Sequence, residues 1–239
     1  MELFEENDPA VFEALPDLSE LFELSIDAYY AALFAQMSEL PIQKEISRFV
    51  EKVKKAGGSF TKGTSGEKIG DARIGEDRAA AVKAATDRGD PDVMAVLKAA
   101  GKAGHEIHRL TGFLRFSPDS NGVFTARCAP DHFVLPALAE HFTLRFGETS
   151  WAIIDEKRGL CLYREKGGEA RLISWSPEKA SGPVPSSLPE ADSEKKQADS
   201  WEDLWRLYHR SINNEGRKNL RLQQQLMPER YRKYLTELS

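Results

Sequence analysis

The spacing of apolar residues changes once along this chain, and that change constrains the fold more than any other feature. Between residues 10 and 109, apolar side chains recur at steps of three and four, which is the spacing of helices with one buried face. From residue 113 to residue 175 the pattern turns to short runs with period two, which is typical of strands. Helices followed by consecutive strands predict an α+β fold.

The helical part begins with a pair of helices over residues 10–55. The second of them opens at Pro41 and ends at Gly57, because proline at the first helical position and glycine after the last turn are common start and stop signals. Further helices are expected over 77–88, over 91–109 with Asp90 as N-cap, and over 133–146.

The strand part predicts an antiparallel sheet of about five strands that is packed by helices. Residues 113–116 and 123–128 form an expected hairpin around Asn121-Gly122, a dipeptide that favours tight turns. A three-strand meander is expected over 151–155, 159–164 and 170–175.

The chain is expected to divide into five segments of different composition. Six glycines indicate a flexible loop before the core, and four prolines among polar residues indicate a linker after it. After the linker, Trp201, Leu204, Trp205, Tyr208 and Ile212 share one helical stripe, which predicts that the tail docks onto the sheet. The segments are an N-terminal helical segment (1–56), the glycine-rich loop (57–75), an α+β core (76–175), the linker (176–200) and C-terminal helices of the same core (201–239).

Composition and charge narrow the class of protein. No apolar run approaches the roughly 20 residues that span a bilayer. Residues 1–27 hold nine acids and no Lys or Arg, unlike the basic start of a secretory signal. Two cysteines, Cys128 and Cys161, are too few for a disulfide framework or a structural zinc site. We therefore expect a cytoplasmic protein that has no membrane association and whose cysteines are buried free thiols.

Two patterns resemble ligand sites, and both have a simpler interpretation. Gly58 and Gly63 have the spacing of a phosphate-binding loop, but Thr64 stands where such a loop has its lysine, so a mobile loop is the simpler interpretation. His105 and His108 can share a helix face and hold a metal, but no spacing ties a third ligand to them. We expect no metal site and no cofactor.

Catalytic motifs are equally sparse. No nucleophile-elbow motif is present, and a serine or cysteine nucleophile would need a base and an acid that no local pattern identifies. The paired acids Asp155 and Glu156 lie next to an expected turn and are most simply solvated surface. A protein without catalytic activity is therefore the leading expectation.

Charge is distributed unevenly along the chain. Residues 217–233 hold six basic residues and one acid, whereas the whole chain has a net charge of −5. A basic tail on an acidic protein indicates a phosphate-binding surface, although it can also be a solvated face or can attract the acidic N-terminal end. Arg115 and Arg127 on the expected hairpin can add to a basic surface only if they share a face of the sheet.

Five long stretches resemble the bacterial domain-of-unknown-function family labelled "probable DNA metabolism protein". They include HRLTGFLRF at 108–116, the PDH triplet at 130–132, the DEKRG turn at 155–159 and the closing R-x-N-x-R-L-Q-x-x-x-M-P-x-R-Y pattern from Arg217 to Tyr231. Members of that family resemble accessory proteins of DNA repair. They are encoded beside DNA-modifying radical S-adenosylmethionine proteins or fused ahead of uracil-DNA glycosylase-like domains.

The resemblance implies an accessory protein of DNA metabolism and repair with DNA as its partner and one of those two proteins as a second partner. The residues expected to bind DNA are Arg109, Arg115, Arg217, Lys218, Asn219, Arg221 and Arg230. Other polar residues that match the family pattern are His108, Asp131 and His132.

Two alternatives stay open at this point. One is a protein-interaction module for a radical S-adenosylmethionine protein that makes no contact with DNA. The other is an enzyme that uses His105, His108, Asp131 or His132 as a base or as a metal ligand.

Overall fold

The computed structural model describes residues 17–58, 71–119, 122–176, 201–217 and 219–236. The chain divides into two units, which we describe separately. Of the described residues, the helical unit holds 17–58, 71–106 and 131–134, and the sheet unit holds 107–119, 122–130, 135–176, 201–217 and 219–236.

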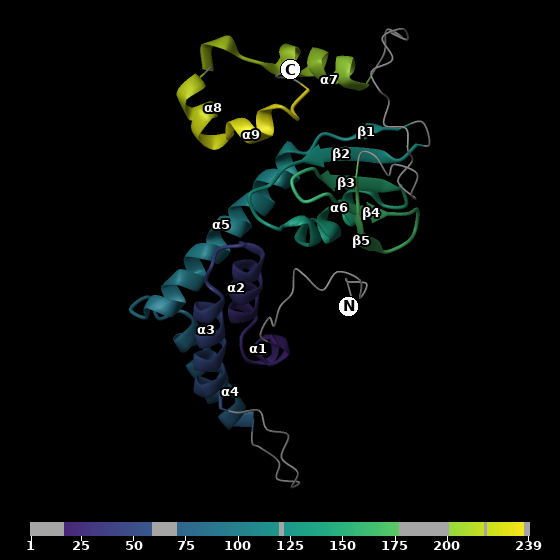
Figure 1. Cartoon of the computed structure of the whole chain (residues 1–239). Helices are drawn as coiled ribbons and strands as arrows, with labels where there is room; N and C mark the ends of the chain where they lie inside the picture. The colour runs from purple at the N-terminus through teal and green to yellow at the C-terminus, as the bar shows by residue number, and fades with distance from the viewer. Residues whose placement is uncertain (1–16, 59–70, 120–121, 177–200, 218, 237–239) are drawn as a thin grey trace. The chain divides into compact units, whose positions relative to one another are not determined.

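The helical unit packs the N-terminal helices around one apolar core (Figure 1). Leu21, Phe49, Val53 and Val96 are completely buried there because each helix turns its apolar stripe inward. The Ser25 hydroxyl caps the second helix by accepting a hydrogen bond from the Ala28 N–H at 3.2 Å. The helices are α1 (Ser19–Leu24), α2 (Ile26–Met37), α3 (Gln43–Ala56), α4 (Asp71–Ala85) and the first part of α5 (Pro91–Phe113).

The start of α5 is fixed by Asp90, as the sequence predicts. Its Oδ1 atom accepts hydrogen bonds from the N–H groups of Asp92 (2.8 Å) and Val93 (3.2 Å). Lys52 of α3 donates to Asp90 at 2.6 Å and to Asp92 at 2.7 Å, which connects α3 to this cap. The α4 helix begins at Asp71, so the last five residues of the expected glycine-rich loop are helical, and 59–70 lie outside the described residues.

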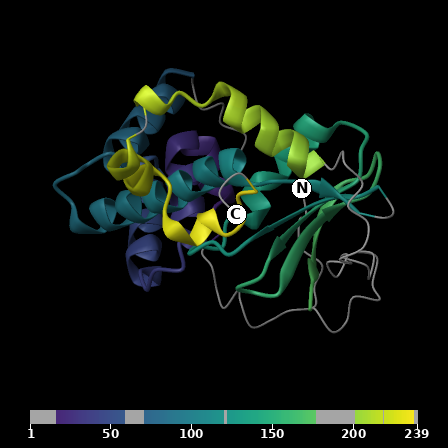
Figure 2. The same ribbon diagram turned by 90° about the horizontal axis from the view of Figure 1, so that it is seen from above.

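The sheet unit contains five strands in the order β1-β2-β3-β4-β5 (Figures 1 and 2). Between β2 and β3 the chain passes through a short helix, η1 (Leu135–Leu138), and then α6 (Ala139–Phe146). The α6 helix packs on the sheet through Phe142, whose ring lies 6.2 Å from the ring of Trp151. The strands are β1 (Ser117–Pro118), β2 (Phe124–Cys128), β3 (Trp151–Asp155), β4 (Leu160–Arg164) and β5 (Ala170–Ser174).

An α+β fold with a five-stranded sheet is confirmed, and the meander β3-β4-β5 lies where the sequence predicts it. Two details of the expected sheet are wrong. Residues 113–116 are not a strand, because α5 continues to Phe113 and the hairpin partner of β2 is the two-residue strand β1. The pairing of β2 with β3 is parallel rather than antiparallel, because the crossover through α6 returns β3 in the same direction.

Both cysteines are buried free thiols, as expected. Cys128 ends β2, and Cys161 is the second residue of β4. Burial raises the pKa of the Cys161 thiol to about 12, so it stays protonated at neutral pH.

The C-terminal helices belong to the sheet unit, and only part of them is buried. Tyr231 and Leu235 are 2% and 0% exposed, which confirms that the end of the tail packs onto its unit. The expected docking of the stripe on α7 (Trp201–Ile212) is wrong, because Leu204, Tyr208 and Ile212 are exposed. The elements are α7 (Trp201–Ile212), η3 (Glu215–Arg217), α8 (Leu220–Leu226) and α9 (Glu229–Arg232), and the expected linker 177–200 lies outside the described residues.

Candidate nucleic-acid interface

Three residues of the basic C-terminal segment surround the start of α8. Asn219 is the N-cap: its Oδ1 atom accepts a hydrogen bond from the Leu222 N–H at 3.0 Å. Arg217 and Arg221 lie on either side of this cap, and both are exposed. The expected pair of arginines is therefore available at the surface, whereas Asn219 has a structural role in forming α8. Lys218 lies outside the described residues.

Arg230 contacts the buried tyrosine that follows it. Its guanidinium lies 4.8 Å from the centre of the Tyr231 ring and donates a hydrogen bond to the Tyr231 hydroxyl at 3.3 Å. The Tyr231 ring in turn lies 5.6 Å from that of Phe113 at the end of α5. Arg230 is half-buried by these contacts, so it is less suited to a phosphate than Arg217 or Arg221.

Arg115 is also engaged in structural contacts. It donates to the carbonyl oxygen of Gly112 at 2.8 Å, in the last turn of α5, where cationic side chains are favoured. Its guanidinium also lies 5.1 Å from the centre of the Trp205 ring of α7. Arg115 thus connects the end of α5 to α7.

Arg127 makes a set of contacts different from those of Arg115. It forms an ion pair with Glu156 at 3.1 Å and lies 5.6 Å from the Trp175 ring, so its charge is partly neutralised. On α5, Arg109 is half-buried and His108 is exposed.

Asp131 and His132 have their backbone held by one buried carboxylate. Glu106 is 2% exposed; its Oε1 accepts from the Asp131 N–H at 3.0 Å, and its Oε2 accepts from the His132 N–H at 2.8 Å. All three residues belong to the helical unit. The PDH triplet therefore has a structural role, because its backbone is held by Glu106. The sequence gives no sign of this role for Glu106, since a lone glutamate on a helix is usually solvated.

Asp155 differs from its expected role as a solvated acid. It is completely buried, and its Oδ1 accepts from the N–H groups of Lys157 (3.0 Å) and Arg158 (3.3 Å). Its Oδ2 accepts from the Arg158 guanidinium at 2.7 Å, and the same guanidinium donates to the Pro130 carbonyl at 3.2 Å. The DEKRG stretch is thus a turn folded around a buried carboxylate.

Glu156 holds the last described residues of the chain. The Tyr234 hydroxyl donates to Glu156 at 2.6 Å, and the Lys233 ammonium lies 3.6 Å away. Burial alone would raise the pKa of Glu156. The hydrogen bonds from Tyr234 and Arg127 and the charge of Lys233 lower it by more than burial raises it, so the pKa lies below its usual range. Burial and the carboxylate together raise the pKa of Tyr234, which therefore stays protonated and keeps donating.

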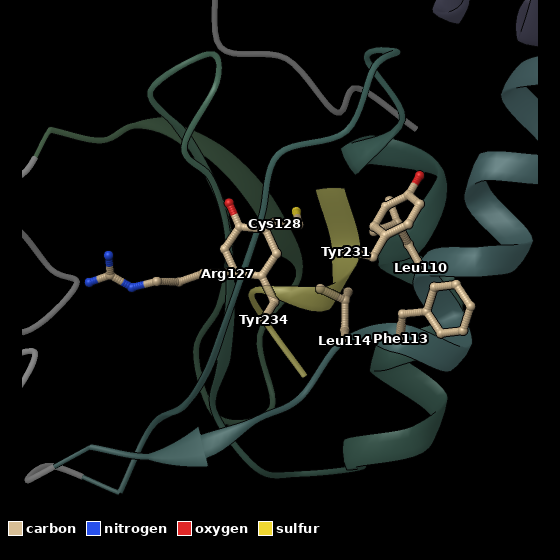
Figure 3. Close-up of a pocket in the computed structure, with 7 residues that line it drawn as sticks. All are labelled: Leu110, Phe113, Leu114, Arg127, Cys128, Tyr231 and Tyr234. Carbon is tan, nitrogen blue, oxygen red and sulfur yellow. The ribbon is translucent and has the colours of Figure 1, made fainter. Parts of the chain in front are cut away.

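A small cleft lies where the C-terminal segment meets α5 and β2 (Figure 3). It has no room for a molecule even as small as water, whereas ligand pockets typically hold about 300 Å³ or more. Tyr231 lies beside Leu110 and Phe113, and the Arg127 guanidinium points away from them. The cleft is a packing seam between apolar side chains. Its lining residues are Leu110, Phe113, Leu114, Arg127, Cys128, Tyr231 and Tyr234.

Two other kinds of site are absent from the described part of the chain. In these residues, no three His, Cys, Asp or Glu side chains are grouped closely enough to hold a metal ion. No helix among them is both long enough and apolar enough to cross a bilayer.

Comparisons with known proteins identify a family. The searches of curated proteins and of solved structures return no match. A family model described as a domain of unknown function, DUF4130, matches residues 76–237, from α4 to the end of the C-terminal segment. Because this match covers more than half of the chain, the protein belongs to that family of domains of unknown function.

Proposed function

We propose that this protein is a non-enzymatic accessory protein of DNA metabolism and repair that binds DNA through the basic C-terminal segment. One observation carries the proposal: Arg217 and Arg221 are exposed on either side of the Asn219 cap, in a segment with six basic residues and one acid. Exposed arginines of this kind contact phosphates and position a strand without reading its sequence. The resemblance to DNA-repair accessory proteins supports the same function.

The contacts of the expected residues support a narrower choice of phosphate-binding residues. Arg115 and Arg230 stack on aromatic rings, and Asn219 caps α8, so these three support the surface rather than form it. Lys218 is placed between the two arginines by the sequence alone. The proposed phosphate-binding residues are therefore Arg217, Lys218 and Arg221.

The test is fluorescence-anisotropy binding to single-stranded, duplex and uracil-containing DNA over a salt series. Replacing Arg217, Lys218 and Arg221 with alanine removes up to three phosphate contacts. The slope of log K against log salt should then become shallower by about 2 to 3 for duplex DNA. The matched control replaces three exposed lysines of the helical unit, Lys44, Lys55 and Lys98, which changes the net charge equally. If the triple alanine variant keeps the wild-type slope of log K against log salt, this surface does not bind DNA.

A second candidate function is a protein-interaction module for a radical S-adenosylmethionine protein or a uracil-DNA glycosylase-like protein. The observation that favours it is the exposure of large apolar residues on α7, among them Leu207 at 63% and Ile212 at 60%. Copurification of a co-expressed pair without nucleic acid tests this candidate. A complex that survives nuclease treatment supports it, and separate elution contradicts it.

A further inference from the structure

Residues 217–226, which we call the phosphate-binding stretch, are mostly exposed. Arg217 and Arg221 are exposed, and Leu220 and Leu226 are each 58% exposed. The Arg217 N–H donates to the Asn214 carbonyl oxygen at 2.9 Å, a bond between residues that are close in sequence. Local bonds of this kind shape the stretch, but they do not fix it to the sheet. Its position therefore depends on the parts of the chain before and after it.

The helix before the stretch, α7, is anchored through two arginines. The Arg115 guanidinium at the end of α5 lies 5.1 Å from the centre of the Trp205 ring. Arg206, the next residue of α7, forms an ion pair with Asp203 at 3.1 Å, and its Nε atom donates to the Thr236 carbonyl oxygen at 3.0 Å. This last bond joins residues 30 positions apart, and the phosphate-binding stretch lies between them.

The residues after the stretch are anchored to α5 and to the turn that follows β3. Tyr231 and Leu235 are buried, and the Tyr231 ring lies 5.6 Å from that of Phe113 (Figure 3). The Tyr234 hydroxyl donates to the Glu156 carboxylate at 2.6 Å. Both ends of the loop that carries Arg217 and Arg221 are therefore held within the sheet unit.

We propose that two of these hydrogen bonds, Arg206 to Thr236 and Tyr234 to Glu156, position the phosphate-binding stretch for DNA. We call the two bonds the C-terminal clasp. The inference rests on the proposed DNA binding and concerns how its affinity is set. A loop closed at both ends has fewer conformations to lose when its arginines meet successive phosphates, so a closed clasp favours binding. Arg206, Tyr234 and Glu156 are thus positioning residues.

The first test is Tyr234→Phe, which removes one hydroxyl and changes no charge. Fluorescence anisotropy with duplex DNA over a salt series should show a dissociation constant that is higher by about threefold to tenfold at each salt concentration. The slope of log K against log salt should stay that of the wild type, because it counts phosphate contacts and none is removed. Tyr30→Phe, at an exposed position of α2 in the helical unit, is the matched control and should change neither quantity.

Glu156→Ala separates positioning from simple electrostatics. Loss of an acid by itself reduces the repulsion of phosphates and should favour DNA binding, whereas loss of the clasp should weaken it. We expect weaker binding for Glu156→Ala and no weakening for Glu140→Ala, which removes an exposed acid from α6. The double variant of Tyr234→Phe and Glu156→Ala should bind no more weakly than the weaker single variant, because both act through one hydrogen bond.

Arg206→Ala opens the other bond of the clasp. It should also lower the affinity at an unchanged salt slope. A slope that is shallower by about 1 would make Arg206 a phosphate contact instead and would contradict its positioning role.

The outcomes distinguish this inference from the proposed function. If the wild type does not bind DNA even at low salt, both are wrong. If the wild type binds and the clasp variants keep its affinity, only the clasp is wrong. Circular dichroism shows whether each variant is folded at the assay temperature, where a loss of stability alone leaves the affinity unchanged. If Glu156→Ala or Arg206→Ala does not fold, Tyr234→Phe decides the question.

Discussion

At the scale of single residues, Glu106 is the buried acid with the clearest structural role, since each of its carboxylate oxygens accepts a backbone N–H. Glu106→Ala leaves the N–H groups of Asp131 and His132 without this acceptor. The free energy of unfolding should fall by about 2–4 kcal/mol. Urea denaturation measures the change. Glu51→Ala, at an exposed position of α3 in the same unit, should change it by less than about 0.5 kcal/mol, and equal effects of the two substitutions would contradict this role.

The Glu156 carboxylate predicts a pH dependence of stability. Its pKa is lowered in the folded protein, so its contribution is present above the ordinary glutamate pKa of about 4.3 and is lost as pH falls through the folded value. Glu156→Gln should therefore be less stable than the wild type at pH 7, and the difference should narrow as pH falls below about 4.3. Denaturation at several pH values tests this, with Glu140→Gln on α6 as control. A constant difference between wild type and Glu156→Gln would be evidence against the ion pairs.

Residue roles were the hardest part to predict from sequence. The exposure of Arg217 and Arg221 was predictable, because charged residues near the start of a helix are normally solvated. The burial of Asp155 and Glu106 could not be predicted, since each accepts from backbone groups that only the folded turn or tertiary packing brings close.

At the scale of elements, the turn between β3 and β4 depends on a glycine. Gly159 has a φ of +62°, and a Cβ atom there would lie 3.0 Å from the Trp175 carbonyl oxygen. Gly159→Ala should lower the free energy of unfolding by about 1–2 kcal/mol. Gly101→Ala should raise it by about 0.5–1 kcal/mol, because Gly101 lies inside α5 with open space around it. Thermal unfolding of both variants checks the opposite signs, and a shift of the same sign for both would refute the argument.

Helices and local strand pairs were predictable, whereas non-local pairing was not. Asp90 and the β3-β4-β5 meander depend on neighbouring residues, so their patterns are visible in sequence. The parallel pairing of β2 with β3 depends on how the chain returns after α6, which strand patterns do not encode. Residues 113–116 alternate like a strand, yet the helical preference of α5 extends to Phe113.

At the scale of the whole molecule, the family match begins inside α4, although α4 and α5 share their core with earlier helices. Ala81, Val93 and Val96 are buried in one cluster with Leu21 and Phe49. A fragment of residues 76–239 should therefore lose the helical unit as a cooperative structure. Circular dichroism should show a loss of helix larger than the removed helices account for. A fragment whose α4 and α5 keep their full helicity would show that the first three helices are dispensable.

The short return of the chain at Asp131–Val134 has a consequence for inheritance. These four residues belong to the helical unit, although the residues on both sides of them belong to the sheet unit. A single recombination breakpoint in the gene therefore cannot transfer either unit intact. The two units are therefore expected to pass between genomes together.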